Sequence, residues 1–277
     1  MGDEMKINAI FEGGGIKGLA YVGVLRFLEK RGFQFNKVGG TSVGAVFAAL
    51  IAAGYNSYEI EELVNDFNPK ILTSMRGRRS EKIINGIKKK GLYSIVNFEK
   101  YLYSVLKDKK KIYFGSVKRG DEYLLKMVAT DIKKRKEVIL PEGLIAYGID
   151  PDSFGIAKGV AMSCSIPLFF QPYRLGEHVF CDGGVVNNFP ITLFSDDEIP
   201  TLGFRLSESP LQKAKGIFSK LKKKPLYDFD KYNIIRINTF GIKATDFEKG
   251  MEKRLDLYIS GYNSIRQYFY QRFDFWL

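Results

Sequence analysis

The chain has 277 residues, of which 45% are hydrophobic, and carries a formal net charge of +12 at pH 7. This length and apolar content suffice for a globular domain with a sizeable core, and no apolar run reaches the roughly 18 residues that a bilayer-spanning helix needs. Two cysteines, Cys164 and Cys181, are too few for a disulfide framework or a four-cysteine metal site, so we expect both to be small buried residues.

Hydrophobic periodicity alternates between strand and helix along the chain, in the manner of an α/β protein. The strand-like segments are 6–13, 35–40, 122–132, 136–140, 201–206 and 234–239, together with a hairpin over 173–184 that turns at Gly176-Glu177. The helical segments are 17–30, 43–54 and 153–163. We therefore predict one domain over residues 1–277, built as a three-layer α/β/α sandwich.

Residues 57–110 also look helical, but they are more polar and more basic than the other helices. This contrast predicts a helical, lid-like insert on the main sheet, which we assign to residues 57–120. Near the C-terminus, apolar residues recur at helical spacing, which favours packing on the core and leaves insertion into a lipid interface as the alternative. They are Leu255, Ile259, Tyr262, Ile265, Phe269, Phe273 and Trp276.

The excess positive charge is concentrated in short runs, at 76–79, 88–90, 107–111, 133–136 and 220–224. Most runs of this kind are solvated faces, and the functional alternatives are nucleic acid or an anionic membrane surface. No helix-turn-helix pattern, zinc finger or RNA-binding signature supports nucleic acid. Acidic residues in the N-terminal MGDEMK, where a secretory signal carries basic ones, predict a cytoplasmic protein that can act at a membrane surface.

The first motif is the glycine-rich stretch FEGGGIKG at 11–18, which follows a strand as a dinucleotide-binding loop would. A dinucleotide fold also needs an acid at the end of the second strand, and residues 35–38 contain none. A Walker loop needs lysine after glycine and before serine or threonine, whereas Lys17 precedes Gly18. Both phosphate-binding interpretations are therefore weak.

The second motif is GGTSVGA, in which Gly40, Ser42 and Gly44 form G-x-S-x-G at a strand-to-helix junction. This is the setting of a nucleophile elbow, in which a sharp turn exposes the serine hydroxyl. If the first two strands are adjacent and parallel, both motifs emerge at the same edge of the sheet. The triple glycine would then lie beside Ser42, with backbone N–H groups suited to a developing oxyanion.

A nucleophilic serine needs a base, and the chain contains one histidine, His178. His178 lies near the predicted hairpin turn, four residues before Asp182, which is about 13 Å along an extended strand. A local His–Asp pair is therefore not expected. We interpret His178 as an ordinary turn residue, with a triad using a distant acid as the alternative.

These motifs resemble those of the patatin-like phospholipases, whose pattern is G-G-G-x-R/K-G, then G-x-S-x-G, then D-G-G/A. The chain meets them in the same order at 13–18, 40–44 and 182–184, and segments 163–172 and 182–190 are similar to the family as well. The resemblance is weakest over 57–120 and in the C-terminal third. One departure is Lys17, where arginine is commoner and would hold a bidentate contact that lysine cannot.

The resemblance implies a fold of the patatin type, a Ser42–Asp182 dyad, an acyl-enzyme and an oxyanion held by Gly13, Gly14 and Gly15. It implies no cofactor or metal and a substrate that is a phospholipid or another acyl-ester lipid. The alternatives are a thioesterase or acyltransferase that uses the same elbow, and a catalytically silent lipid-binding protein. Supporting roles fall on Lys17, Gly18, Gly40, Gly44, Gly183 and Gly184.

Overall fold

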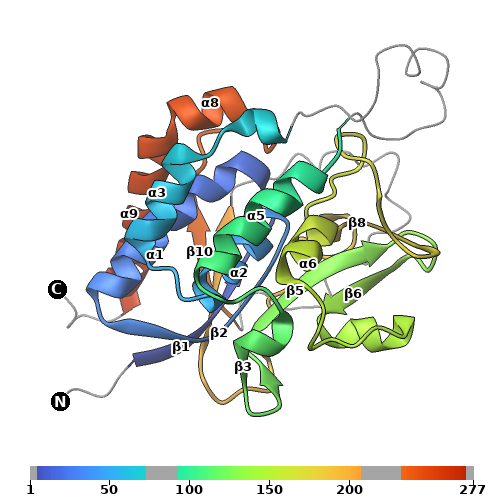
Figure 1. The fold of residues 1–277 in the computed structure, drawn as a ribbon. Helices are drawn as coiled ribbons and strands as arrows, with labels where there is room; N and C mark the ends of the chain where they lie inside the picture. Colours follow the sequence, from blue (N-terminus) through green and yellow to red (C-terminus); the bar gives the residue numbers. More distant parts are fainter. Residues whose placement is uncertain (1–4, 73–92, 207–231, 273–277) are drawn as a thin grey trace.

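A mixed sheet crosses the middle of the protein in the computed structural model, which describes residues 5–72, 93–206 and 232–272 (Figure 1). Within these residues the sheet has eight strands in the order β10-β9-β1-β2-β5-β8-β7, with β6 paired to β5. The first five strands in that order run parallel, whereas β6 and β8 are antiparallel to β5. The strands are β1 (Met5–Phe11), β2 (Phe33–Thr41), β5 (Leu125–Asp131), β6 (Lys136–Leu140), β7 (Tyr173–Leu175), β8 (His178–Asp182), β9 (Thr201–Leu206) and β10 (Asn233–Ile237), beside a separate small hairpin of β3 (Lys118–Arg119) and β4 (Glu122–Tyr123).

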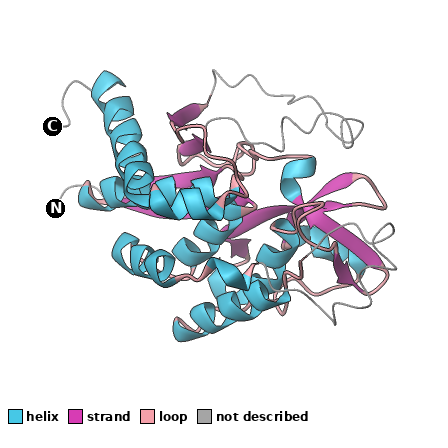
Figure 2. Ribbon diagram, turned by 90° about the horizontal axis from the view of Figure 1, so that it is seen from above, coloured by secondary structure: helices cyan, strands magenta, loops and turns pink. Residues whose placement is uncertain are grey.

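Helices flank this sheet, as Figure 2 shows from above. They are α1 (Ala20–Lys30), α2 (Val43–Ala52), α3 (Ser57–Asp66), α5 (Val96–Asp108), α6 (Ile156–Ser163), α8 (Phe247–Glu252) and α9 (Arg254–Arg272). Short 3₁₀ turns are η1 (Gly15–Leu19), η2 (Pro69–Ile71), η3 (Phe114–Val117), η4 (Glu142–Tyr147) and η5 (Gly183–Val185). The predicted α/β class is confirmed, and so are the predicted helices, the hairpin turn at Gly176-Glu177 and the predicted strands, except that 122–132 divides into β4 of the small hairpin and β5 of the main sheet.

Strand alternation divides the core into two clusters, one on each face of the sheet. In β1, Ala9 and Phe11 belong to the large cluster with residues of α1, α2, α6 and α9. Ile10 points to the other face, where Phe189 and Ile191 pack on it from the segment between β8 and β9. Helix α2, which follows the G-x-S-x-G motif, therefore lies inside the larger core, where its almost uniformly apolar sequence belongs.

The region expected to form a lid contributes α3 and α5, and its residues 73–92 lie outside the described part. Helix α3 begins with a capping box, in which the Asn56 side chain accepts N–H bonds from Tyr58 and Glu59 while the Glu59 carboxylate accepts the Asn56 N–H. Residues of α3 and α5 line a cavity with residues of α2, so the two polar helices bury their apolar faces over the elbow helix.

The C-terminal helix α9 packs closely on α1. A Cβ atom on Gly23 would lie 1.8 Å from the carbonyl oxygen of Tyr258, so the two helix backbones meet there without side chains between them. Packing is thus confirmed for Ile265, which is fully buried, and for the partly buried Tyr262 and Phe269. Packing on the core is wrong for two residues of the predicted stripe, because Leu255 is 60% exposed and Ile259 is 59% exposed. Phe273 and Trp276 lie outside the described residues.

Two of the five basic runs fall in the described part of the chain. Run 107–111 ends α5, where Lys109 pairs with Glu59, and run 133–136 forms the β5–β6 turn, where Lys133 donates to the carbonyl of Glu177. Runs 76–79, 88–90 and 220–224 lie outside it. None of the described helices is both long enough and apolar enough to cross a bilayer.

Candidate active site

Ser42 occupies the sharp turn between β2 and α2, as the elbow motif predicts. Its φ of 55° and ψ of −126° are a strained conformation for a residue with a side chain. The glycines around it allow a close approach of backbones: a Cβ atom on Gly44 would lie 2.1 Å from the Phe11 carbonyl oxygen, and one on Gly40 would lie 2.5 Å from the Gly44 carbonyl carbon. The helix can therefore begin directly beside Ser42.

Asp182 lies beside Ser42 because β2 and β8 both pair with the same edge of β5. The other edge is taken by β6, which pairs with Met127–Asp131. Strand β2 ends with Thr41 opposite Val128, and β8 ends with Asp182 opposite the next residue, Ala129. The two strands run toward each other and stop at adjacent positions of β5, about 3.3 Å apart. Two residues separated by 140 positions in sequence thus leave the sheet side by side.

The Asp182 carboxylate is completely buried and only partly satisfied. Its Oδ1 accepts the Gly184 N–H at 2.7 Å, whereas Oδ2 accepts no hydrogen bond from any described residue. Burial raises the pKa of Asp182 to about 7, although the neighbouring Ser42 side chain and the Gly184 N–H both lower it. The carboxyl group therefore combines increased basicity with an oxygen that can receive a proton.

The other serines near Ser42 are bound to the backbone. The Ser163 hydroxyl donates to the Val128 carbonyl at 2.6 Å and accepts the Ser42 N–H at 2.9 Å, while the Ser165 hydroxyl donates to the Ala161 carbonyl at 2.7 Å. Both residues are fully buried. Ser163 thereby holds the backbone of the elbow, and of these three serines Ser42 is the one that lines the apolar cavity.

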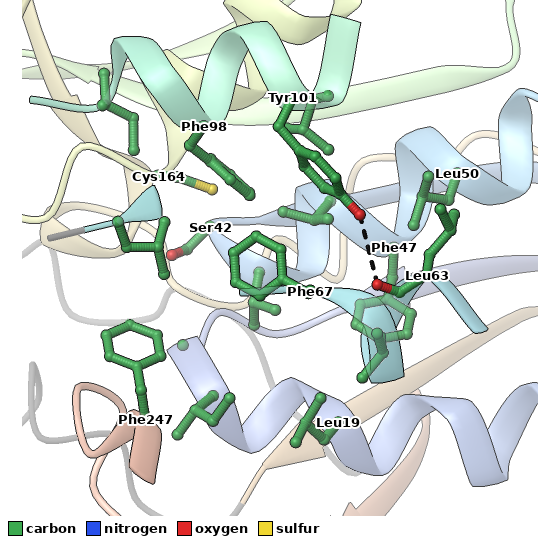
Figure 3. A pocket seen from close by; sticks show the side chains of 18 of the residues that line it. Leu19, Ser42, Phe47, Leu50, Leu63, Phe67, Phe98, Tyr101, Cys164 and Phe247 are labelled. Atoms are coloured by element: carbon green, nitrogen blue, oxygen red, sulfur yellow. Dashed lines mark hydrogen bonds between the residues drawn. The ribbon is translucent and has the colours of Figure 1, made fainter. Parts of the chain in front are cut away.

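Both cysteines are buried, as expected, but Cys164 also lines the cavity beside Ser42 (Figure 3). Burial, with the nearby Asp182 charge, raises the pKa of its thiol well above the ordinary value, so the sulfur is uncharged at neutral pH. Composition alone could not have located Cys164 at the site.

The triple glycine lies beside Ser42, as the parallel pairing of β1 and β2 predicts. A Cβ atom on Gly13 would lie 3.2 Å from that of Ser42, and Gly15 has a φ of 56° that favours glycine. The Gly13 N–H donates to the Asn188 carbonyl at 3.0 Å, and the Ile16 N–H to that of Ala244 at 3.0 Å. The N–H groups of Gly14 and Gly15 have no such partner among the described residues, so this loop offers two donors rather than three.

The remaining motif glycines also lie at close contacts. A Cβ atom on Gly18 would lie 2.5 Å from Val43, and one on Gly183 would lie 2.2 Å from the Val128 carbonyl oxygen. Gly184 would meet the Asn188 side-chain oxygen at 2.5 Å. The three motif loops are thus packed directly against one another or against β5.

Glu12, which sequence analysis did not single out, is a second buried carboxylate beneath the glycine loop. Its Oε2 accepts the Leu206 N–H at 2.7 Å, and its Oε1 accepts from Asn188 at 3.3 Å and lies 3.6 Å from Arg205. Burial raises the pKa of Glu12 to about 7, against the opposing effects of Arg205, the Leu206 N–H and the fully buried Lys17. Lys17 is thus a buried cation close enough to Glu12 to act on its charge.

Asn188 connects the glycine loop to the Asp182 loop. Its amide nitrogen donates to the Gly13 carbonyl at 3.0 Å as well as to Glu12, and its oxygen lies where a Cβ on Gly184 would be. The stretch DGGVVNNFP, already noted for its family resemblance, contained this residue, but the sequence carried no sign of its contacts.

Ser42 lies at one side of an apolar cavity of about 140 Å³ between α2, α3 and α5 (Figure 3). Its walls include Phe47 and Leu50 from α2, Leu63 from α3, and Phe98 from α5. A cavity of this character suits a hydrocarbon chain and offers little to a charged or sugar-containing ligand. The predicted lid helices therefore form one wall of the site.

His178 lies away from the dyad, at the start of β8. It is four residues from Asp182 along the strand, about 13 Å, and its ring packs edge-on against Tyr147 with centroids 4.7 Å apart. Nothing in these contacts couples His178 to Ser42.

Comparison with known proteins agrees with these motifs. A family model described as patatin-like phospholipase matches residues 9–195. YqhO of Bacillus subtilis, an uncharacterized protein, is 34% identical over 277 residues, covering 91% of this chain and 94% of its own. The probable lipid hydrolase 463L of Invertebrate iridescent virus 6 is 28% identical over 192 residues, 66% of this chain and 61% of its own.

A solved structure shares the fold as well. VipD from Legionella pneumophila aligns with 96% of this chain and 67% of its own, with a TM-score of 0.63 at 19% sequence identity. The family match contains Ser42, Asp182 and the glycine loop, and it confirms the resemblance that the three motifs indicated. The chain therefore belongs to the patatin-like phospholipase family.

Proposed function

We propose that the chain is a serine acyl hydrolase that cleaves fatty-acyl esters of phospholipids or related lipids. The observation that carries the proposal is the pairing of a strained Ser42 with a buried Asp182 whose Oδ2 is unbonded among the described residues, at the edge of an apolar cavity. Family membership supports a lipid substrate, and the cavity supports its acyl chain.

In the acylation step, Asp182 takes the Ser42 hydroxyl proton while Oγ bonds to the ester carbonyl carbon. The N–H groups of Gly14 and Gly15, beside the N-terminus of α2, stabilise the oxyanion. The carbon–oxygen bond to the alcohol then breaks, and the alcohol leaves with the proton from Asp182.

In the deacylation step, Asp182 removes a proton from water as the water oxygen attacks the acyl-enzyme. Collapse of the second oxyanion returns the proton to Ser42 and releases a fatty acid. If another alcohol or thiol replaced water, the same acyl-enzyme would transfer its acyl group, so the fate of the acyl group separates hydrolase from acyltransferase.

The test is labelling with a lipid-like organophosphonate, followed by peptide mapping. We expect one adduct, at Ser42, and none after Ser42→Ala. Ser163 and Ser165 are internal controls, because their hydroxyls are buried and donate to backbone carbonyls. An adduct at either, or unchanged turnover of a lipid ester by Ser42→Ala, would overturn the proposal.

A further inference from the structure

The cavity beside Ser42 follows one face of α2. Val43, Val46, Phe47 and Leu50 line it at the spacing of successive helical turns. Eight residues separate Ser42 from Leu50, which corresponds to about 12 Å along the helix axis. The cavity thus has a direction, beginning at the nucleophile and ending near the last turn of α2.

The opposite wall comes from α3 and α5, which contact each other through aromatic rings. Phe67, the residue just after α3, packs against Phe98 at 6.0 Å and against Tyr101 at 5.4 Å, both on α5. In Figure 3, Phe98 lies near Ser42 and Cys164, whereas Tyr101 lies farther along the cavity, on the side of Leu50.

Two tyrosine hydroxyls tie the helices together at this far end. Tyr101 of α5 donates to the Leu63 carbonyl of α3 at 3.4 Å, drawn as the dashed line in Figure 3. Tyr55, just after α2, donates to the Val105 carbonyl near the end of α5 at 2.7 Å. Of the two tyrosines, Tyr101 lines the cavity, so its ring is held there by the hydrogen bond to α3.

We propose that Tyr101 sets the length of the acyl chain that the site accepts. The site holds one medium-length chain, extending from the Ser42 acyl carbonyl along α2 to the Tyr101 ring, and a longer chain meets that ring. This inference rests on the proposed function, since it takes Ser42 as the attachment point of the acyl group.

The experiment compares hydrolysis of nitrophenyl esters with butanoyl, decanoyl and hexadecanoyl chains. The natural sequence should prefer decanoyl, and Tyr101→Ala should raise the rate on hexadecanoyl relative to decanoyl about tenfold, the scale on which pockets discriminate by chain length. Val46→Phe, one helical turn from Ser42, should move the preference in the opposite direction, toward butanoyl.

Tyr103→Ala is the matched control, because Tyr103 is on the same helix but 45% exposed and outside the cavity lining. It should keep the chain-length preference of the natural sequence. If Tyr101→Ala and Val46→Phe both leave that preference unchanged while Ser42→Ala abolishes hydrolysis, the length inference fails and the proposed function stands. If Ser42→Ala retains hydrolysis, the proposed function fails and the inference fails with it.

Discussion

Two buried carboxylates lie at the motif loops, and they differ in what their oxygens contact. Asp182 and Glu12 are both almost inaccessible to solvent, and burial raises the pKa of each to about 7. Glu12 has contacts on both oxygens, with the Leu206 N–H, Asn188 and Arg205. Asp182 has a backbone partner on Oδ1 and no described hydrogen-bond partner on Oδ2.

This difference shows that a raised pKa alone does not identify a general base. A base also needs an oxygen that is free to receive a proton and lies close to the nucleophile. Asp182 meets both conditions, because β2 and β8 end at adjacent residues of β5. Glu12 instead uses its two oxygens to bind β9 and Asn188.

The largest expected effect is on turnover, which substitution of Asp182 should lower far more than substitution of Glu12. Asp182→Asn should lower the turnover of a lipid ester by about 10³-fold, the scale of a lost general base. Glu12→Gln keeps an oxygen for the Leu206 N–H and should lower it by less than about tenfold. Both rates should be measured beside thermal melts, because a folded variant is required for the comparison. Equal losses of activity in two well-folded variants would remove the distinction between the acids.

Much of this arrangement could be predicted from sequence. The strand and helix periodicity, the elbow and the glycine loop are local patterns, and parallel pairing of the first two strands places Gly13 beside Ser42. Asp182 was reached through family resemblance, because its position depends on β2 and β8 sharing one edge of β5. Such pairing joins segments that are far apart, and local pattern does not encode it.

Other features could not have been predicted for a similar reason. Glu12, Asn188 and Cys164 act through contacts made by the folded chain, and the sequence segments that contain them carry no sign of those contacts. The apolar stripe near the C-terminus predicted too broad a packed face, because α9 meets α1 along a narrow line at Gly23 and Gly261. Leu255 and Ile259 lie off that line and are exposed.

The second prediction concerns stability, for which the two acids should behave alike. Each has a folded pKa of about 7, above the ordinary value near 4. The native state therefore keeps protons that the unfolded chain releases, and stability falls as pH rises from about 4 to about 7. Asp182→Asn and Glu12→Gln should each gain on the order of 3 to 4 kcal/mol relative to the natural sequence across that window.

Urea unfolding at pH 4.5 and pH 7.5 measures this change. Asp152→Asn is the control, because Asp152 is exposed and a hydrogen bond from Tyr123 holds its pKa below the ordinary value, so any change should have the opposite sign. If Asp182→Asn had the same stability as the natural sequence at every pH, the pKa of the Asp182 carboxyl would not be raised in the folded protein.

The smallest expected effect is that of His178→Ala, which tests whether the pH dependence of activity comes from Asp182 or from a histidine. If Asp182 is the base, kcat/KM should rise about tenfold per pH unit below pH 7 and level off above it. Histidine side chains in general titrate in this range as well, so the profile alone does not identify the group. His178 packs on Tyr147 at the start of β8, four residues of strand from Asp182, and so lies outside the proposed proton transfer. His178→Ala should therefore keep the rate within about twofold and leave the midpoint near pH 7. Loss of the rising limb in a variant with an unchanged melt would show that a histidine drives the reaction, and the dyad would have to be replaced by a triad.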